Sequence, residues 1–131
     1  MEDFEKQLSG DVLIEKVNLQ RATLVEANIM KKRLLDDIQL NNKNIIIDIS
    51  KCDFIDSTFL GALVVSLKRT RETGGDIKIV IASSVAKTLN VTGVLRVFKN
   101  YSSVEDALNS FRPTSRTPQI ELANQRDIVS I

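Results

Sequence analysis

Residues 45–64 read IIIDISKCDFIDSTFLGALV, and this stretch decides the fold. The run Ile45-Ile46-Ile47-Asp48-Ile49 is rich in β-branched residues and lacks polar alternation, which is typical of a strand covered on both faces. A polar segment, Ser50 to Asp56, follows the strand. Apolar residues then recur at helical spacing until Gly74-Gly75, at Leu60, Leu63, Val64 and Leu67. The stretch therefore predicts a central strand, a loop and a helix in succession.

Toward the N-terminus, residues 4–8 and 12–17 predict two strands joined by a tight turn, in which Gly10 supplies a positive φ. This hairpin is expected at the edge of the sheet. A helix follows over residues 22–41, because apolar side chains fall on one face at 100° per residue: Leu24, Ala27, Met30, Leu34, Leu35 and Ile38. Val25 and Ile29 lie off that face, and the sequence does not decide whether they form a dimer contact.

Toward the C-terminus, the pattern predicts a strand over residues 77–82, a short helix over 84–91, a brief strand at 97–98 and a helix over 104–111 opened by Ser102-Ser103. The fold class is therefore α/β: one domain over residues 1–111, with a mostly parallel central sheet of four to five strands and about four helices. Residues 112–131, with Pro113 and Pro118, are expected to form a flexible tail. Contacts with partners are expected at the carboxyl ends of the strands, where Ser50 to Ser57 lies.

Composition excludes several classes of function. With 18 Lys and Arg against 17 Asp and Glu, the net charge of +1 gives no field to hold nucleic acid. We expect no membrane insertion and a cytoplasmic chain, because no apolar run is long enough to cross a bilayer and the first residues are acidic. A sequence with no histidine and one cysteine, Cys52, offers almost no metal ligands and no imidazole to activate a nucleophile. We expect no cofactor and no enzymatic activity.

Asp56-Ser57-Thr58 stands immediately before the helix that follows the central strand. In one interpretation Ser57 only caps that helix by accepting a hydrogen bond from a free backbone N–H. In the other, Ser57 is a site that a partner acts upon. The local sequence does not decide between the two.

The string from Ile45 to Val64 resembles the signature of STAS domains, the family named for sulphate transporters and anti-sigma factor antagonists. Thr73-Gly74-Gly75 and residues 83–98 are also similar to the family pattern in order and spacing, so the resemblance covers about residues 3–111. Within the family the chain is most similar to the free-standing bacterial anti-sigma factor antagonists.

This resemblance implies a partner-switching function. The unphosphorylated chain would bind an anti-sigma factor that is also a serine kinase with a GHKL-type ATPase fold, and so free the sigma factor. Phosphorylation of Ser57 would end that binding until a protein phosphatase resets the chain, which would be a monomer or weak dimer. The expected partner-binding residues are Asp56, Ser57, Thr58, Gly61, Ala62, Val65, Arg69 and Asn18.

Two departures from the family pattern bear on partner choice. Asn18 stands where many members carry an aspartate, and Phe59 places a bulky ring where the family often has glycine, with an expected effect on how closely a partner approaches. Two alternatives also stay open. The chain could be a structural STAS module of a larger regulatory or transporter-accessory complex, never phosphorylated, or a hydrolase with Ser57 as nucleophile and Lys51 or a carboxylate as base.

Overall fold

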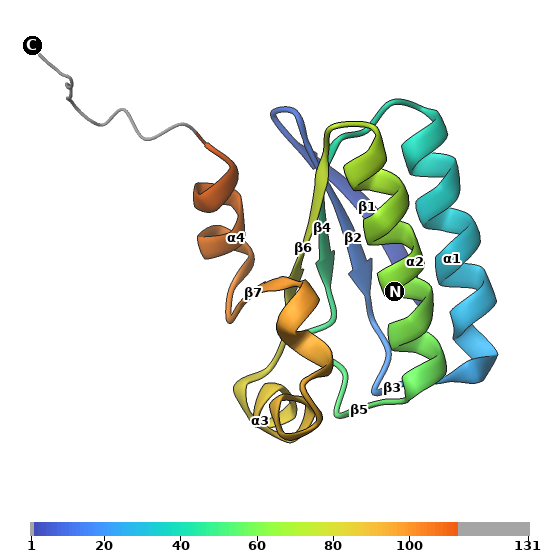
Figure 1. Cartoon of the computed structure of the whole chain (residues 1–131), viewed down its shortest axis with the longest axis vertical. Helices are drawn as coiled ribbons and strands as arrows, with labels where there is room; N and C mark the ends of the chain where they lie inside the picture. The colour runs from blue at the N-terminus through green and yellow to red at the C-terminus, as the bar shows by residue number, and fades with distance from the viewer. Residues whose placement is uncertain (1, 113–131) are drawn as a thin grey trace, which may run out of the picture.

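The structure of the protein is a computed structural model that describes residues 2–112, except for the side chains of residues 90–92, 94 and 95. Of the expected tail, residues 112–131, all but Arg112 lie outside the described residues. The main sheet has five strands in the order β1-β2-β4-β6-β7, in which β1 and β2 are antiparallel and the later neighbours are parallel (Figure 1). The strands are β1 (Phe4–Ser9), β2 (Val12–Val17), β4 (Asn44–Asp48), β6 (Asp76–Val80) and β7 (Lys99–Tyr101).

Helices cover both faces of this sheet. α1 (Leu24–Gln39) and α2 (Ser57–Glu72) pack side by side on one face, and the shorter α4 (Val104–Phe111) covers the other (Figure 1). α3 (Ser83–Thr92) and the 3-10 helix η1 (Val94–Val97) lie at the carboxyl edge of the parallel strands. The expected α/β fold with an N-terminal edge hairpin is confirmed.

The central strand β4 shows why its sequence does not alternate. Ile45 and Ile47 belong to the large core under α1 and α2, whereas Ile46 belongs to a smaller core under α4, and all three are fully buried. A strand with an apolar environment on each face gains from burying every side chain, so a continuous apolar run is the stable choice.

Gly10 and Gly75 occupy positions where a residue with a Cβ atom would be strained or would clash. Gly10 has a φ of +62° in the β1–β2 turn, as its position predicts. At Gly75, a Cβ atom would lie 2.2 Å from the carbonyl oxygen of Lys43, so only glycine allows the chain leaving α2 to pass that closely.

Several local predictions were wrong. Residues 50–56 are not loop throughout: β5 (Phe54–Ile55) pairs in parallel with β3 (Arg21–Ala22) to form a second, two-stranded sheet. The last strand is β7 and not residues 97–98, because Val97 ends the 3-10 helix. Leu24 was expected in the core but is 62% exposed at the first position of α1, and the buried residues of that helix begin with Ala27.

Candidate functional site

Asp56, and not Ser57, caps α2. Its backbone is extended, with φ −91° and ψ 171°, and its Oδ1 accepts a hydrogen bond of 2.8 Å from the backbone N–H of Phe59. Its Oδ2 accepts a second bond of 2.8 Å from the backbone N–H of Leu24, the first residue of α1. One carboxylate therefore fastens the N-termini of both helices together, at the positive ends of their dipoles.

Ser57 is the first residue of α2, and its side chain is exposed. Since Asp56 performs the capping, the interpretation of Ser57 as the cap is wrong. No hydrogen bond joins the Ser57 hydroxyl to another side chain or backbone group in the described part of the chain. The hydroxyl is therefore presented to solvent beside N–H groups at the start of a helix.

A groove of about 370 Å³ lies beside this residue, between α1 and α2. Its wall combines small and apolar side chains with neutral polar ones and a single lysine: Ala27, Asn28, Lys31, Thr58, Gly61, Ala62 and Val65. Val65 is 47% exposed. A surface of mostly small and uncharged side chains next to an exposed hydroxyl can accept the side chains of a protein partner.

Four of the eight expected partner-binding residues line this groove: Thr58, Gly61, Ala62 and Val65. Thr58 and Gly61 are exposed there, but Ala62 is only 8% exposed, because it packs between α2 and α1 at the floor of the groove. Arg69 lies two turns further along α2 from Ala62, away from the groove, with an exposed side chain 3.9 Å from Glu72. The site is thus more compact than the sequence suggested.

Phe59 does not face a partner. Its ring is fully buried in the core under α2, so the expectation that it limits a partner's approach was wrong. Position 59 points inward because it lies on the same side of the helix as Leu63 and Leu67, which are also buried.

Asn18 follows β2 directly and contacts Lys51 in the segment that leads to Ser57. Its side-chain amide donates to the backbone oxygen of Glu2 at 2.9 Å and to the carboxylate of Glu5 at 3.0 Å. Its oxygen accepts a bond of 3.1 Å from Lys51 in the loop. The neutral amide can serve as both donor and acceptor, which an aspartate could not. Asn18 therefore holds the 50–56 loop to the first strand.

Asp53 and Phe54 are also held in place by contacts with the segment before α1. Asp53 donates its N–H to the oxygen of Gln20 at 2.7 Å, and the guanidinium of Arg21 lies 4.3 Å from the centre of the Phe54 ring. Cys52 is fully buried, and burial raises the pKa of its thiol to about 11, so the thiol is a poor nucleophile. Sequence reasoning missed the tie between Asp56 and Leu24, because it is a contact between residues 32 positions apart.

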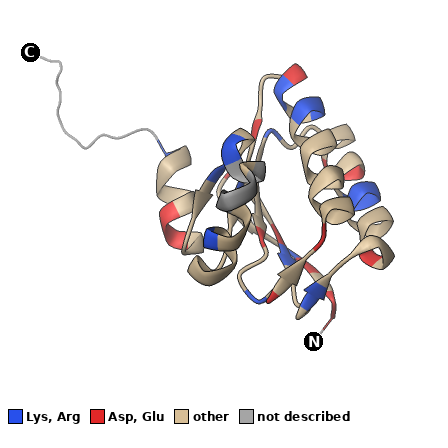
Figure 2. Cartoon of the chain, turned by 60° about the horizontal axis from the view of Figure 1, so that its bottom comes forward, with Lys and Arg blue, Asp and Glu red and all other residues tan. Residues whose placement is uncertain are grey.

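Other chemistry is not supported among the described residues. No group of histidine, cysteine, aspartate and glutamate side chains in residues 2–112 is arranged to hold a metal ion. Within the same range, no helix is both long and apolar enough to cross a membrane. Figure 2 shows the basic and acidic segments interspersed over the elements, which agrees with the net charge of +1.

The chain belongs to the STAS domain family, whose model matches residues 9–107. The family is non-enzymatic, so the exposed Ser57 is not the nucleophile of a hydrolase. None of the curated proteins with which the sequence was compared matches it.

Solved structures show what the fold is similar to. A candidate anti-sigma factor antagonist from Thermotoga maritima is 26% identical with a TM-score of 0.74, and the match covers 84% of this chain and 95% of that one. An anti-sigma factor antagonist from Mycobacterium paratuberculosis is 19% identical with a TM-score of 0.74, over 84% and 93% of the two chains. The phosphorylated form of the Bacillus cell fate determinant SpoIIAA is 12% identical with a TM-score of 0.63, over 83% and 99%.

Proposed function

We propose that the protein is an anti-sigma factor antagonist that acts in the cytoplasm and is switched by phosphorylation of Ser57. The unphosphorylated chain binds a serine-kinase anti-sigma factor and frees the sigma factor, and the phosphorylated chain does not bind. The observation that carries the proposal is the exposed Ser57 hydroxyl at the start of α2, which does not cap the helix and lies beside a groove lined mostly by small and uncharged side chains.

The main effect of phosphorylation at this surface is added negative charge. A phosphoserine carries about −1.5 to −2 charges at neutral pH. Helix N–H groups favour that charge, so the folded chain tolerates it. The carboxylate of Asp56 is adjacent, however, and a partner shaped for a neutral hydroxyl would have to bury the new charge next to an existing one. Docking is weakened although the fold is kept.

The docking surface extends from Ser57 over the groove. We assign partner contacts to Thr58, Gly61 and Val65, which are exposed, and to Ala62, which forms the floor. Asp56 has a supporting role, because it positions the first turns of both helices. Asn18 and Arg69 belong to the periphery of the surface, and Asn18 sets the position of the loop through Lys51.

The proposal is tested with the full chain immobilised as bait and lysate of the source cell as prey, followed by purification of the retained kinase. With ATP, the kinase should add one phosphate to the wild type, seen by intact mass, and none to Ser57→Ala. Thr58→Ala is the matched control, since it removes the neighbouring exposed hydroxyl and should still gain the phosphate. A chain that gains no phosphate at Ser57 from any kinase it binds would support the structural-module alternative and reject the switch.

A further inference from the structure

A charged cluster lies away from the Ser57 site, where α1 packs on the β1–β2 hairpin. Glu15 in β2 is 0% exposed and Asp37 in α1 is 1% exposed. Two buried carboxyl groups in one core are costly, because each ionised group loses its hydration. Such a pair needs compensation from its neighbours.

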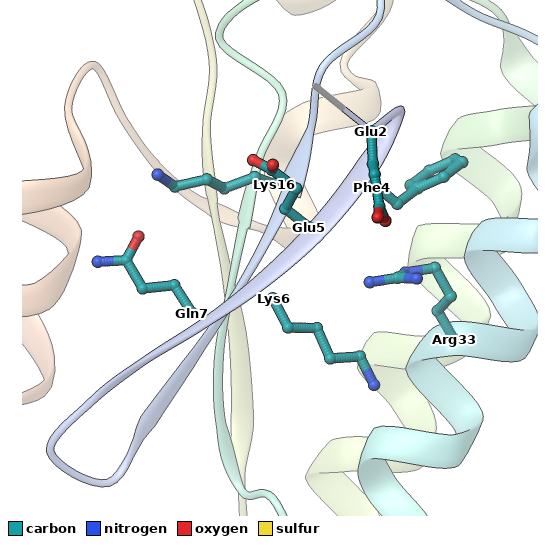
Figure 3. A pocket seen from close by; sticks show the side chains of 7 residues that line it. All are labelled: Glu2, Phe4, Glu5, Lys6, Gln7, Lys16 and Arg33. Carbon is teal, nitrogen blue, oxygen red and sulfur yellow. The ribbon is translucent and has the colours of Figure 1, made fainter.

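Two cations supply part of the compensation. Arg33 donates to Glu15 Oε1 from its Nε at 3.0 Å and from its Nη2 at 2.8 Å. The ammonium of Lys6 lies 2.6 Å from Asp37 Oδ1 and 3.8 Å from Glu15 Oε2, so one cation contacts both carboxyl groups. Figure 3 shows Lys6 extending from β1 toward α1 and Arg33 extending from α1 toward the hairpin, while Gln7 and Lys16 point to the other side.

One oxygen of each carboxyl group is left over. Glu15 Oε2 and Asp37 Oδ2 are buried and have no hydrogen-bond partner. Carboxylates only accept hydrogen bonds, so two of them cannot satisfy each other. A single proton held between the two groups turns one into a donor and gives both orphan oxygens a partner.

We propose that Glu15 and Asp37 hold one proton between them at neutral pH, so that a carboxylic acid–carboxylate hydrogen bond fastens α1 to β2. Burial raises the pKa of Glu15 to about 8, and the proximity of Asp37 acts in the same direction. Arg33 opposes the shift without cancelling it.

The groups around Glu15 are few and come from three elements. β1 contributes Lys6, its partner in register, and α1 contributes Arg33 and Asp37. On the other side, β4 presents the apolar Ile47. With one shared proton the cluster carries one net positive charge, and the ammonium of Lys6, which is 40% exposed, places that charge at the surface.

The sign of the pH dependence follows from the raised pKa. Glu15 has an ordinary pKa of 4.5 and a folded-state pKa of about 8, so between these values the folded chain binds more protons than the unfolded chain. The contribution of this group to stability is fully present below pH 4.5 and is lost as the pH rises to about 8. The site is therefore a proton-dependent fastening of α1.

The test uses Glu15→Gln in the full chain, because the glutamine amide can accept from Arg33 and donate to Asp37 as the protonated carboxyl does. Urea unfolding midpoints are measured from about pH 5 to about pH 8.5, with the exposed Glu72→Gln as matched control. We expect the wild-type midpoint, relative to that of Glu15→Gln, to fall steadily over this range, and the control to follow the wild type. A difference that stays constant with pH would overturn the proposal.

A second measurement does not depend on the stability of any variant. The side-chain carboxyl carbon of Glu15 is followed by NMR in the wild-type chain, and we expect it to titrate near pH 8 and not near its ordinary value. In Asp37→Asn, which removes the negative charge and the shared proton, the midpoint should move down. A wild-type Glu15 that is already ionised at pH 6 would contradict the shared proton.

Discussion

Asp56 and the Glu15–Asp37 pair stabilise the same helix, α1, in opposite ways. Asp56 lies at the N-termini of α1 and α2, and both of its oxygens accept backbone hydrogen bonds of 2.8 Å. Glu15 lies in β2 and Asp37 in the last turn of α1, and each keeps one buried oxygen without a hydrogen-bond partner. A carboxyl group beside helix N–H groups is satisfied as an anion, whereas two carboxyl groups facing each other in a core need a proton.

The difference explains where a charge switch can be built into this fold. Negative charge added at Ser57 meets a helix dipole and water, so we expect the domain to accept it. Negative charge added near Glu15 would meet a buried site that already lacks donors. The start of α2 is therefore suited to reversible modification, and the buried pair is suited to holding the domain together.

Removing Arg33, a cation that contacts the buried Glu15–Asp37 pair, should have the largest effect on stability. Arg33→Met deletes two hydrogen bonds to a fully buried carboxyl group, and we expect a loss of about 2 to 4 kcal/mol in the free energy of unfolding. Lys32→Met is the control on the same helix, since Lys32 forms only an exposed ion pair with Asp36. Equal losses in urea unfolding of the two variants would show that the buried cluster is not a special site.

Removing the shared cap should have the next largest effect. Asp56→Ala leaves the N–H groups of Phe59 and Leu24 without their acceptors, and we expect a loss of about 2 kcal/mol. Asp56→Asn keeps one amide oxygen and should recover about half of the loss. If alanine and asparagine cost the same in thermal or urea unfolding, the carboxylate does not join the two helices.

Adding charge at Ser57 should change stability least. Ser57→Asp places a carboxylate in the first turn of α2, where the helix dipole offsets repulsion from Asp56, and we expect a change within about 0.5 kcal/mol. Circular dichroism during urea unfolding measures it. A loss above about 2 kcal/mol would mean that modification acts by unfolding the domain and not by changing its surface.

The sequence was a good guide wherever local pattern and burial agree. The run at Ile45–Ile49 predicted the central strand because that strand has a core on both faces. Gly10 predicted the hairpin turn because the turn requires a positive φ, which glycine adopts readily. The helix over residues 104–111 was also confirmed, with Ser103 as its cap. The resemblance to STAS domains predicted the role of Ser57, and the helical pattern predicted that Gly61, Ala62 and Val65 lie off the core face; their roles stay predictions.

What the sequence could not supply depends on contacts between distant residues. The pairing of β3 with β5 involves two residues from each strand, too few to leave a periodic pattern. Asp56 is a favoured residue for the cap of α2, but its second hydrogen bond, from the N–H of Leu24 in α1, is a long-range contact that no local rule describes. Glu15 occurs in an otherwise apolar strand, and only the position of Arg33, Lys6 and Asp37 shows how it is accommodated.

The most direct measurement compares the affinity of one purified kinase partner for the bare chain and for the chain phosphorylated on Ser57, by calorimetry without nucleotide turnover. The switch predicts a dissociation constant for the phosphorylated chain that is larger by about a hundredfold, which corresponds to about 2.7 kcal/mol. Two dissociation constants that agree within a factor of about two would contradict it.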